Sequence, residues 1–211
     1  MGDTAGRIAA MESVRADEGV RVDDSRCPVT WPGWAAAVWG FVFAVPSFYW
    51  ALGGLTGAQS TVSPSLVHLV EERNAGFIAV LWLTGVLKVV GGLLGLALVR
   101  RRAWGRGMSC LLQLLAWGAG VLLVWHGALF VGQGLLVEVH AVELAPELRG
   151  VSRWYTYLWG PWFVAGGIAF LLAAWAHSRG LTERRSARIA GVVGGCGALL
   201  LSVVALVMGI G

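Results

Sequence analysis

The chain has 211 residues, of which 57% are hydrophobic and only 13% are charged. Because a soluble domain carries about 25% charged residues, this composition excludes an ordinary soluble domain and indicates a membrane protein. The net charge of +4 does not call for a nucleic-acid partner, since arginines that flank apolar segments and orient them in the membrane account for it.

Residues 1–30 are predicted to form a mobile, charged cytoplasmic tail. Residues 1–26 mix six acidic residues with four arginines and contain few large apolar side chains, a composition that does not support a packed core. The apolar run that follows has an alternative interpretation as a cleaved signal sequence. Its length and its long, partly acidic leader favour an uncleaved membrane anchor instead.

Residues 31–211 are predicted to form a transmembrane helix bundle. A membrane-spanning helix needs about 20 mainly apolar residues, and five such runs are present: about 34–55, 76–99, 108–135, 154–176 and 189–210. The runs are continuous, whereas the strands of a membrane barrel alternate between apolar and polar residues. The predicted fold class is therefore all-α, a polytopic bundle of five transmembrane helices.

The basic residues predict the orientation of this bundle. Most arginines lie in the N-terminal tail and in the loops that follow the second and fourth runs: Arg7, Arg15, Arg21, Arg26, Arg100, Arg101, Arg102, Arg106, Arg179, Arg184, Arg185 and Arg188. The opposite segments hold only Arg73, Arg149 and Arg153. Because positively charged loops stay in the cytoplasm, we expect the N-terminus inside and the C-terminus outside.

The two predicted outer loops each contain a histidine followed by acidic residues. Ser63 to Asn74 is predicted to form a short interfacial helix, in which His68 lies on the same side as Glu71 and Glu72. In the second loop, His140 precedes Glu143 by three residues. Two such pairs would offer imidazole and carboxylate ligands to a metal such as zinc. Solvated polar faces are the favoured interpretation, and we predict no metal and no cofactor.

Lys88 interrupts the second apolar run near its centre, within LTGVLKVVGG. It is about 18 Å from the nearer end of the helix, which is farther than its stem of about 6 Å reaches by snorkelling. A lysine at this depth costs about 2.5–3.5 kcal/mol on insertion scales, and such residues usually face the interior of a bundle or water. Because side chains lean toward the N-terminus of a helix, we expect Lys88 to point into the outer half of the bundle.

Other polar and aromatic residues are predicted to share that outer half. His126 and Gln133 are seven residues apart on one face of the third run. The first and fourth runs add aromatic side chains, and Gly160-Pro161 predicts a kink in the fourth. We therefore predict an outer-facing pocket whose candidate ligand-binding residues are Lys88, His126, Gln133, Tyr49, Trp50, Trp159 and Trp162.

Three functions fit these residues. The protein binds a small molecule, a lipid or an anion in the pocket; or it is a structural or accessory protein that acts through helix packing; or it is a membrane enzyme that uses Lys88 or His126. The sequence contains no serine-nucleophile motif, no paired intramembrane carboxylates and no HExxH motif, so a non-enzymatic role is favoured.

Two pairs of glycines have the spacing of close helix contacts. Gly91 and Gly95 lie in the second run, and Gly191 and Gly195 lie in the fifth. GxxxG pairs let two helix backbones approach closely in a membrane. They predict contacts within the bundle or, as the alternative, a weak homodimer. The other expected partner is the lipid bilayer.

Two short motifs resemble a known family. Phe48 to Gly54 reads FYWALGG, and Leu158 to Phe163 reads LWGPWF. Together they resemble an uncharacterised family of small multi-pass membrane proteins of high-GC actinobacteria, defined by a domain of unknown function. The resemblance covers about residues 34–176 and leaves out the tail and the fifth run. It implies a bacterial plasma membrane location and carries no established activity.

Overall fold

The computed structural model describes residues 29–100, 105–181 and 184–207, so nearly all of the predicted tail lies outside the described residues. Every regular element in the described part is a helix. In chain order these are α2 (Trp31–Ala51), α3 (Ala58–Thr61), α4 (Pro64–Glu71), α5 (Ala75–Val99), α6 (Arg106–Glu138), α7 (Pro146–Trp154), the π-helical turn η1 (Tyr155–Trp159), α8 (Gly160–Arg179) and α9 (Arg184–Val207).

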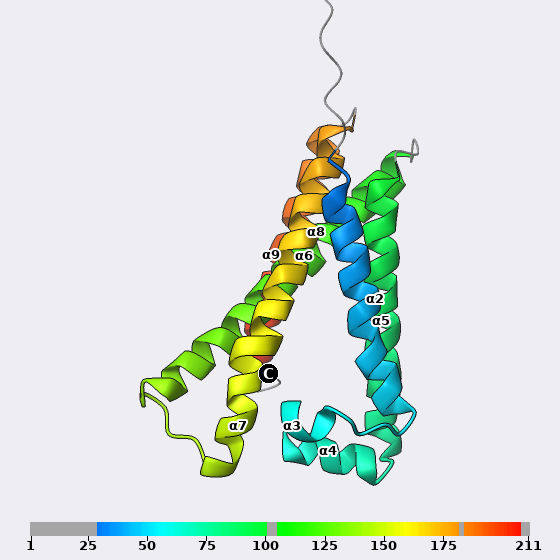
Figure 1. The fold of residues 1–211 in the computed structure, drawn as a ribbon. Helices are drawn as coiled ribbons and strands as arrows, with labels where there is room; N and C mark the ends of the chain where they lie inside the picture. Colours follow the sequence, from blue (N-terminus) through cyan, green and yellow to red (C-terminus); the bar gives the residue numbers. More distant parts are fainter. Residues whose placement is uncertain (1–28, 101–104, 182–183, 208–211) are drawn as a thin grey trace, which may run out of the picture.

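Five of these helical segments are long and apolar enough to cross a membrane, namely α2, α5, α6, the continuous α7–η1–α8 segment and α9. The prediction of an all-α chain with five candidate spans is confirmed. The third helix has 33 residues and extends a few residues beyond the predicted span of about 108–135 at both ends. At about 1.5 Å per residue it extends for about 50 Å, well beyond a hydrocarbon core of about 30 Å. It therefore tilts or projects beyond the lipid, and α6 does run obliquely in Figure 1.

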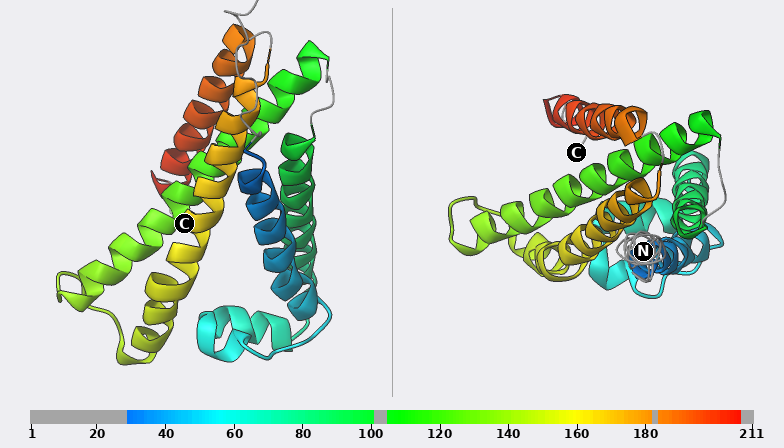
Figure 2. Two further views of the ribbon diagram at one scale, coloured as in Figure 1. Left: turned by 45° about the horizontal axis from the view of Figure 1, so that its top comes forward. Right: turned by 90° about the horizontal axis from the view of Figure 1, so that it is seen from above.

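The helices form two arms (Figures 1 and 2). The first arm consists of α2 and α5, and the second consists of α6, α8 and α9. The arms meet through α2 and α8, at the end of the molecule where α2 begins and α8 ends. They diverge toward the other end, where α3 and α4 lie between them. The residues that connect α2 to α5, 52–74, are called the outer segment below.

Glycines set the close approach of helices within each arm. A Cβ added to Gly40 in α2 would lie 2.6 Å from the amide nitrogen of Gly92 in α5, and one added to Gly127 in α6 would lie 2.5 Å from the carbonyl oxygen of Gly160. Backbone atoms cannot yield to such contacts as flexible side chains can. These positions therefore require glycine, as expected for helices that pack through small residues in a membrane.

The glycines of the predicted GxxxG pairs also have contacts within the chain. A Cβ on Gly95 would lie 2.6 Å from the amide nitrogen of Ala37, and a Cβ on Gly191 would lie 2.7 Å from the ring of Trp117. Both glycines are buried inside their arms. The contacts within the bundle account for these glycines, and a homodimer through them stays a prediction.

An aromatic cluster joins the two arms. Trp39 of α2 lies 6.2 Å from the ring of Trp162 and 6.2 Å from that of Phe170, both in α8, and it is 5.0 Å from Phe43. The Trp39 indole also donates a 2.8 Å hydrogen bond to the carbonyl oxygen of Trp162. Aromatic pairs contribute about 0.5–1.5 kcal/mol each beyond their buried area. This cluster therefore fixes the point from which the arms diverge.

The fourth span contains a π-helical turn just before Pro161. The amide of Gly160 donates to the carbonyl of Tyr155, five residues back. Pro161 has no amide hydrogen, so the regular α-helical hydrogen bond to Tyr157 cannot form there, and a wider turn accommodates this loss. The extra residue rotates the side chains before Pro161 relative to those after it. Tyr155 and Trp159 both line the pocket described next.

Candidate functional site: a pocket between the two arms

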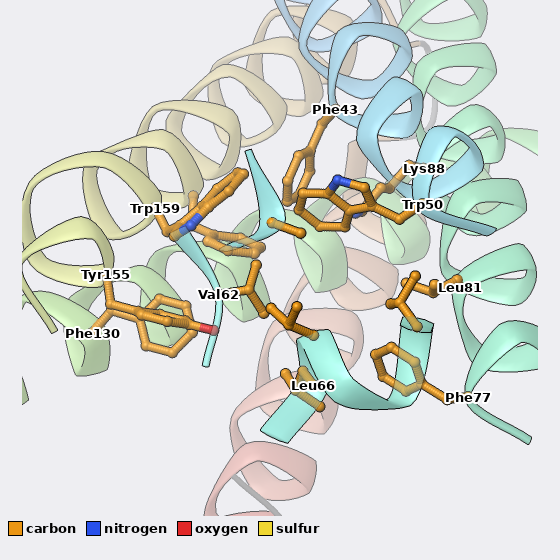
Figure 3. A pocket seen from close by; sticks show the side chains of 14 residues that line it. Phe43, Trp50, Val62, Leu66, Phe77, Leu81, Lys88, Phe130, Tyr155 and Trp159 are labelled. Atoms are coloured by element: carbon orange, nitrogen blue, oxygen red, sulfur yellow. The ribbon is translucent and has the colours of Figure 1, made fainter. Parts of the chain in front are cut away.

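A pocket of about 210 Å³ lies between the arms, closed on one side by the outer segment. Its walls come from both arms, from the π-turn and from the outer segment (Figure 3). The lining residues are Phe43, Trp50, Ala58, Val62, Leu66, Val67, Val70, Phe77, Leu81, Lys88, Phe130, Tyr155, Trp159 and Phe163. Lys88 is the only one of them with a basic side chain, and Tyr155 adds a phenol hydroxyl, so the pocket is a mainly aromatic and aliphatic chamber with a single cationic group.

Lys88 is held at the pocket by two contacts with α2. Its amine donates a 2.7 Å hydrogen bond to the hydroxyl of Ser47, and it lies 3.7 Å from the centroid of the Phe43 ring. Ser47 is only 2% exposed. Among the residues that the structure describes, no carboxylate forms an ion pair with Lys88. A neutral hydroxyl and a ring face thus support the amine, without a counter-charge.

Two tryptophans of the pocket wall use their polar atoms to hold the outer segment. Trp50 of the first arm donates to the carbonyl of Thr56 (3.4 Å), and Trp159 of the second arm donates to the carbonyl of Thr61 (3.0 Å). Both indole N–H groups are therefore engaged at the rim of the pocket. Their rings provide apolar wall surface.

The outer segment closes the diverging end of the pocket with apolar side chains. These are Ala58 from α3, Val62, and Leu66, Val67 and Val70 from α4. The Arg73 guanidinium donates a 3.0 Å hydrogen bond to the carbonyl of Ala51, which ties the region after α4 to the end of α2. The short helix predicted within Ser63 to Asn74 is present as α4, with Ser63 directly before it and Pro64 as its first residue.

Three predicted site residues, Lys88, Trp50 and Trp159, line the pocket. Trp162 lies behind the wall, in the aromatic cluster, and its indole nitrogen is buried without a hydrogen-bond partner in the described part of the chain. Tyr49 is 44% exposed, and its hydroxyl donates to Thr56 at 3.0 Å. Of the predicted aromatic residues, Trp50 and Trp159 therefore line the pocket, Trp162 packs behind its wall, and Tyr49 lies at the surface.

The other two predicted residues lie on α6, outside the pocket lining. His126 packs edge-on against Phe130 and Phe163, with centroid distances of 4.4 Å and 5.0 Å. Since both phenylalanines line the pocket, His126 lies behind them. Gln133 is exposed. The pocket lining therefore combines Lys88 with aromatic rings and includes neither His126 nor Gln133.

Sequence reasoning did not select Ser47, Phe43 or the apolar residues of the outer segment. A signal for Ser47 was present, because it is the only serine or threonine in the first apolar run, residues 34–55. A lone hydroxyl at that depth is a natural partner for a lysine in a neighbouring helix. Phe43 has no comparable signal, since it is one of several aromatic residues in the same helix.

The predicted outer histidines have separate surroundings. His68 Nδ1 lies 3.2 Å from a carboxylate oxygen of Glu72, and both side chains are exposed. His140 follows the end of α6 in a left-handed backbone conformation (φ 59°). Within residues 29–100, 105–181 and 184–207, no group of three or more His, Cys, Asp or Glu side chains is arranged to hold a metal ion.

Comparison with protein families gives a match over residues 40–170 to the family described as "Protein of unknown function (DUF3995)". The match covers more than half of the chain. The protein belongs to the DUF3995 family. This confirms the resemblance to an uncharacterised domain family. No curated protein and no solved structure matches the chain.

The position of the pocket within the DUF3995 region is informative. All of its lining residues lie between Phe43 and Phe163, inside the matched range. Ser47 and the aromatic cluster that joins the arms also lie inside it or at its edge, whereas α9 lies outside. The pocket is therefore built from the part of the chain that defines the family.

Proposed function

We propose that this DUF3995 protein is a multi-pass protein of the bacterial plasma membrane that binds a small molecule, lipid or anion in the pocket between its arms. The observation that carries this proposal is the placement of Lys88 in the wall of an apolar pocket, with a neutral hydroxyl as its hydrogen-bond partner. A charge in the middle of a membrane span is costly and typically marks a site of function. A bound anion or polar group would balance or solvate the charge of Lys88, for which the described part of the chain supplies no counter-ion.

The proposed orientation places this pocket toward the outside of the cell. The converging end of the arms carries the arginine-rich boundaries, including Arg100 after α5, Arg106 at the start of α6 and Arg184 at the start of α9. The positive-inside rule supports a cytoplasmic location for that end. The N-terminus is then inside, the C-terminus outside, and the outer segment faces the extracellular side.

A pocket-filling substitution tests the binding function. Val62 lines the middle of the pocket and is half-buried (Figure 3), so Val62→Trp adds volume there with little cost to the packing of the core. Val45→Trp is the matched control, because Val45 is 63% exposed on the outside of α2. Both variants add one indole, and only the first adds it to the pocket.

Thermal unfolding of the purified proteins in detergent, with a panel of small organic anions and their neutral analogues, provides the measurement. A ligand at 100 times its Kd adds about 2.7 kcal/mol of stability, or roughly 5–10 °C for a chain of this size. We expect at least one compound to stabilise the wild type and Val45→Trp, and not Val62→Trp. Equal shifts in all three proteins for every compound would refute the proposal.

A further inference from the structure

We infer that the ligand of this pocket is a small apolar monocarboxylic acid, bound with its carboxylate against Lys88 and its apolar body toward the outer segment. This inference rests on the proposed binding function and specifies its ligand. It draws on three features of the pocket: the chemistry of the cationic end, the position of that end, and the size and character of the remaining walls.

The cationic end suits one carboxylate. A lysine ammonium has three donor hydrogens, of which one is directed to Ser47 and the others remain for a ligand. Phe43 covers another side of the amine with its ring face, an arrangement that favours a cation. A neutral ligand would leave the charge uncompensated in an apolar chamber, and a dianion would bring an excess negative charge into it. A monoanion balances the site.

The position of Lys88 sets the direction of the ligand. In Figure 3, Lys88 lies beside Phe43 and Trp50 at one end of the pocket, and Leu66 and Phe77 lie at the other. Lys88 is 13 residues after the start of α5, whereas Phe77 is two residues after it. The cation is therefore at the deep end, near the middle of the span, and the apolar walls are nearer the surface. An acid in this pocket binds with its charged group inward.

The walls and volume limit the apolar body. An apolar cavity of about 150 Å³ accommodates benzene, so the 210 Å³ here admits one ring with a short chain, or an acyl chain of similar bulk. Phe77, Phe130, Phe163 and Trp159 provide aromatic faces on several sides. The pocket is too small for a two-chain lipid to lie wholly inside it.

Two pairs of probes separate charge from shape. 3-Phenylpropanoate and 3-phenylpropanamide have nearly the same size and differ in charge, and octanoate and octanamide form a second pair with a flexible body. Binding is measured calorimetrically at neutral pH with the full chain in nanodiscs of uncharged lipid. The Val62→Trp protein in the same discs supplies the signal that comes from partitioning into lipid, which is subtracted.

For the wild type we expect at least one acid to bind ten times more tightly than its amide. Lys88→Met keeps the length of the side chain and removes the charge, so it should bind acid and amide equally. Retained amide binding shows that the variant is folded. Ser47→Ala should keep the preference for the acid and bind it more weakly, because the amine loses its anchor.

The outcomes distinguish the two proposals. If the wild type binds amides as tightly as acids, or Lys88→Met keeps the preference for acids, the ligand class is wrong and the binding function stands. If no probe shows binding that Val62→Trp abolishes, the ligand class is wrong. The binding function is wrong as well only if every compound of the thermal-unfolding panel shifts the wild type, Val45→Trp and Val62→Trp equally.

Discussion

The amine of Lys88 in α5 and the hydroxyl of Ser47 in α2 form a 2.7 Å hydrogen bond between two antiparallel helices of the first arm. The bond satisfies a donor at the middle of a span with an acceptor that carries no charge. It holds the cation at the wall of the pocket and leaves the charge itself without a counter-ion in the described part of the chain. The charge of Lys88 should therefore favour the binding of an anion and lower the stability of the unliganded protein.

Replacing Lys88 should stabilise the unliganded protein. Lys88→Met removes a charge that costs about 2.5–3.5 kcal/mol at the centre of a span and loses a hydrogen bond and a cation–π contact worth about 1–2 kcal/mol together. We expect a net gain of about 0.5–2.5 kcal/mol, measured by thermal or denaturant unfolding in one detergent. A loss of stability would mean that a compensating group already neutralises the amine.

Ser47→Ala should have the opposite effect. It leaves the buried amine without its hydrogen-bond partner, at a cost of about 1–3 kcal/mol. In the Lys88→Met background the same substitution should cost less than about 0.5 kcal/mol, because the interaction is already absent. A double-mutant cycle from the four unfolding free energies measures this coupling; additive effects would contradict the role assigned to Ser47.

The glycine contacts predict a sharp contrast between two positions in α6. A Cβ on Gly127 would lie 2.5 Å from the carbonyl oxygen of Gly160, whereas nothing lies within 4 Å of a Cβ on Gly132. Gly127→Ala should therefore destabilise the bundle by about 1–3 kcal/mol, the usual range for overpacking. Gly132→Ala should be neutral or should add up to about 1 kcal/mol from helix propensity.

Unfolding of the two alanine variants and the wild type in the same detergent provides the comparison. The relationship between α6 and α8 would have to be revised if both glycines tolerated alanine equally well.

The proposed orientation predicts which end of the molecule a reagent outside the cell can reach. In a background without the native cysteines, Ser65→Cys places a thiol on the exposed surface of α4, and Gly180→Cys places one after α8 at the converging end. A membrane-impermeant maleimide should label the first in intact cells and the second only after the cells are opened. The reverse pattern would establish the opposite topology.

The helices themselves could be predicted from the sequence because their signals are local. Long apolar runs between arginines and glycines gave the correct number of candidate spans, and Ser63-Pro64 marked the start of α4. The extra residues at both ends of α6 and the π-turn before Pro161 were not predicted. Gly160-Pro161 indicates an irregularity at this point, and the proline alone does not specify whether the helix kinks or widens into a π-turn.

Which residues line the pocket depends on how each helix is rotated about its own axis. The position of a residue along its helix does not specify this rotation. Depth along the helices predicts Lys88 and His126 in the same half of the bundle, and therefore near each other. In the structure, the contact between Gly127 and Gly160 sets α6 against α8, and His126 packs beside Phe130 and Phe163. Contacts of this kind join residues far apart in the sequence, so the spacing of residues within one helix does not reveal them.

The attachment of the outer segment has a kinetic consequence. The segment is continuous with α2 and α5, and Arg73 ties it again to Ala51, so it moves with the first arm. Its side-chain hydrogen bond to the second arm in the described residues runs from Trp159 to the carbonyl of Thr61. A hydrogen bond of this kind is worth about 1 kcal/mol. Elsewhere the second arm meets this segment by packing, where α3 contacts α7. A substitution that removes the Trp159 indole N–H and keeps the ring bulk would therefore loosen this side of the pocket without opening its other walls, and we expect it to speed the exchange of a bound ligand.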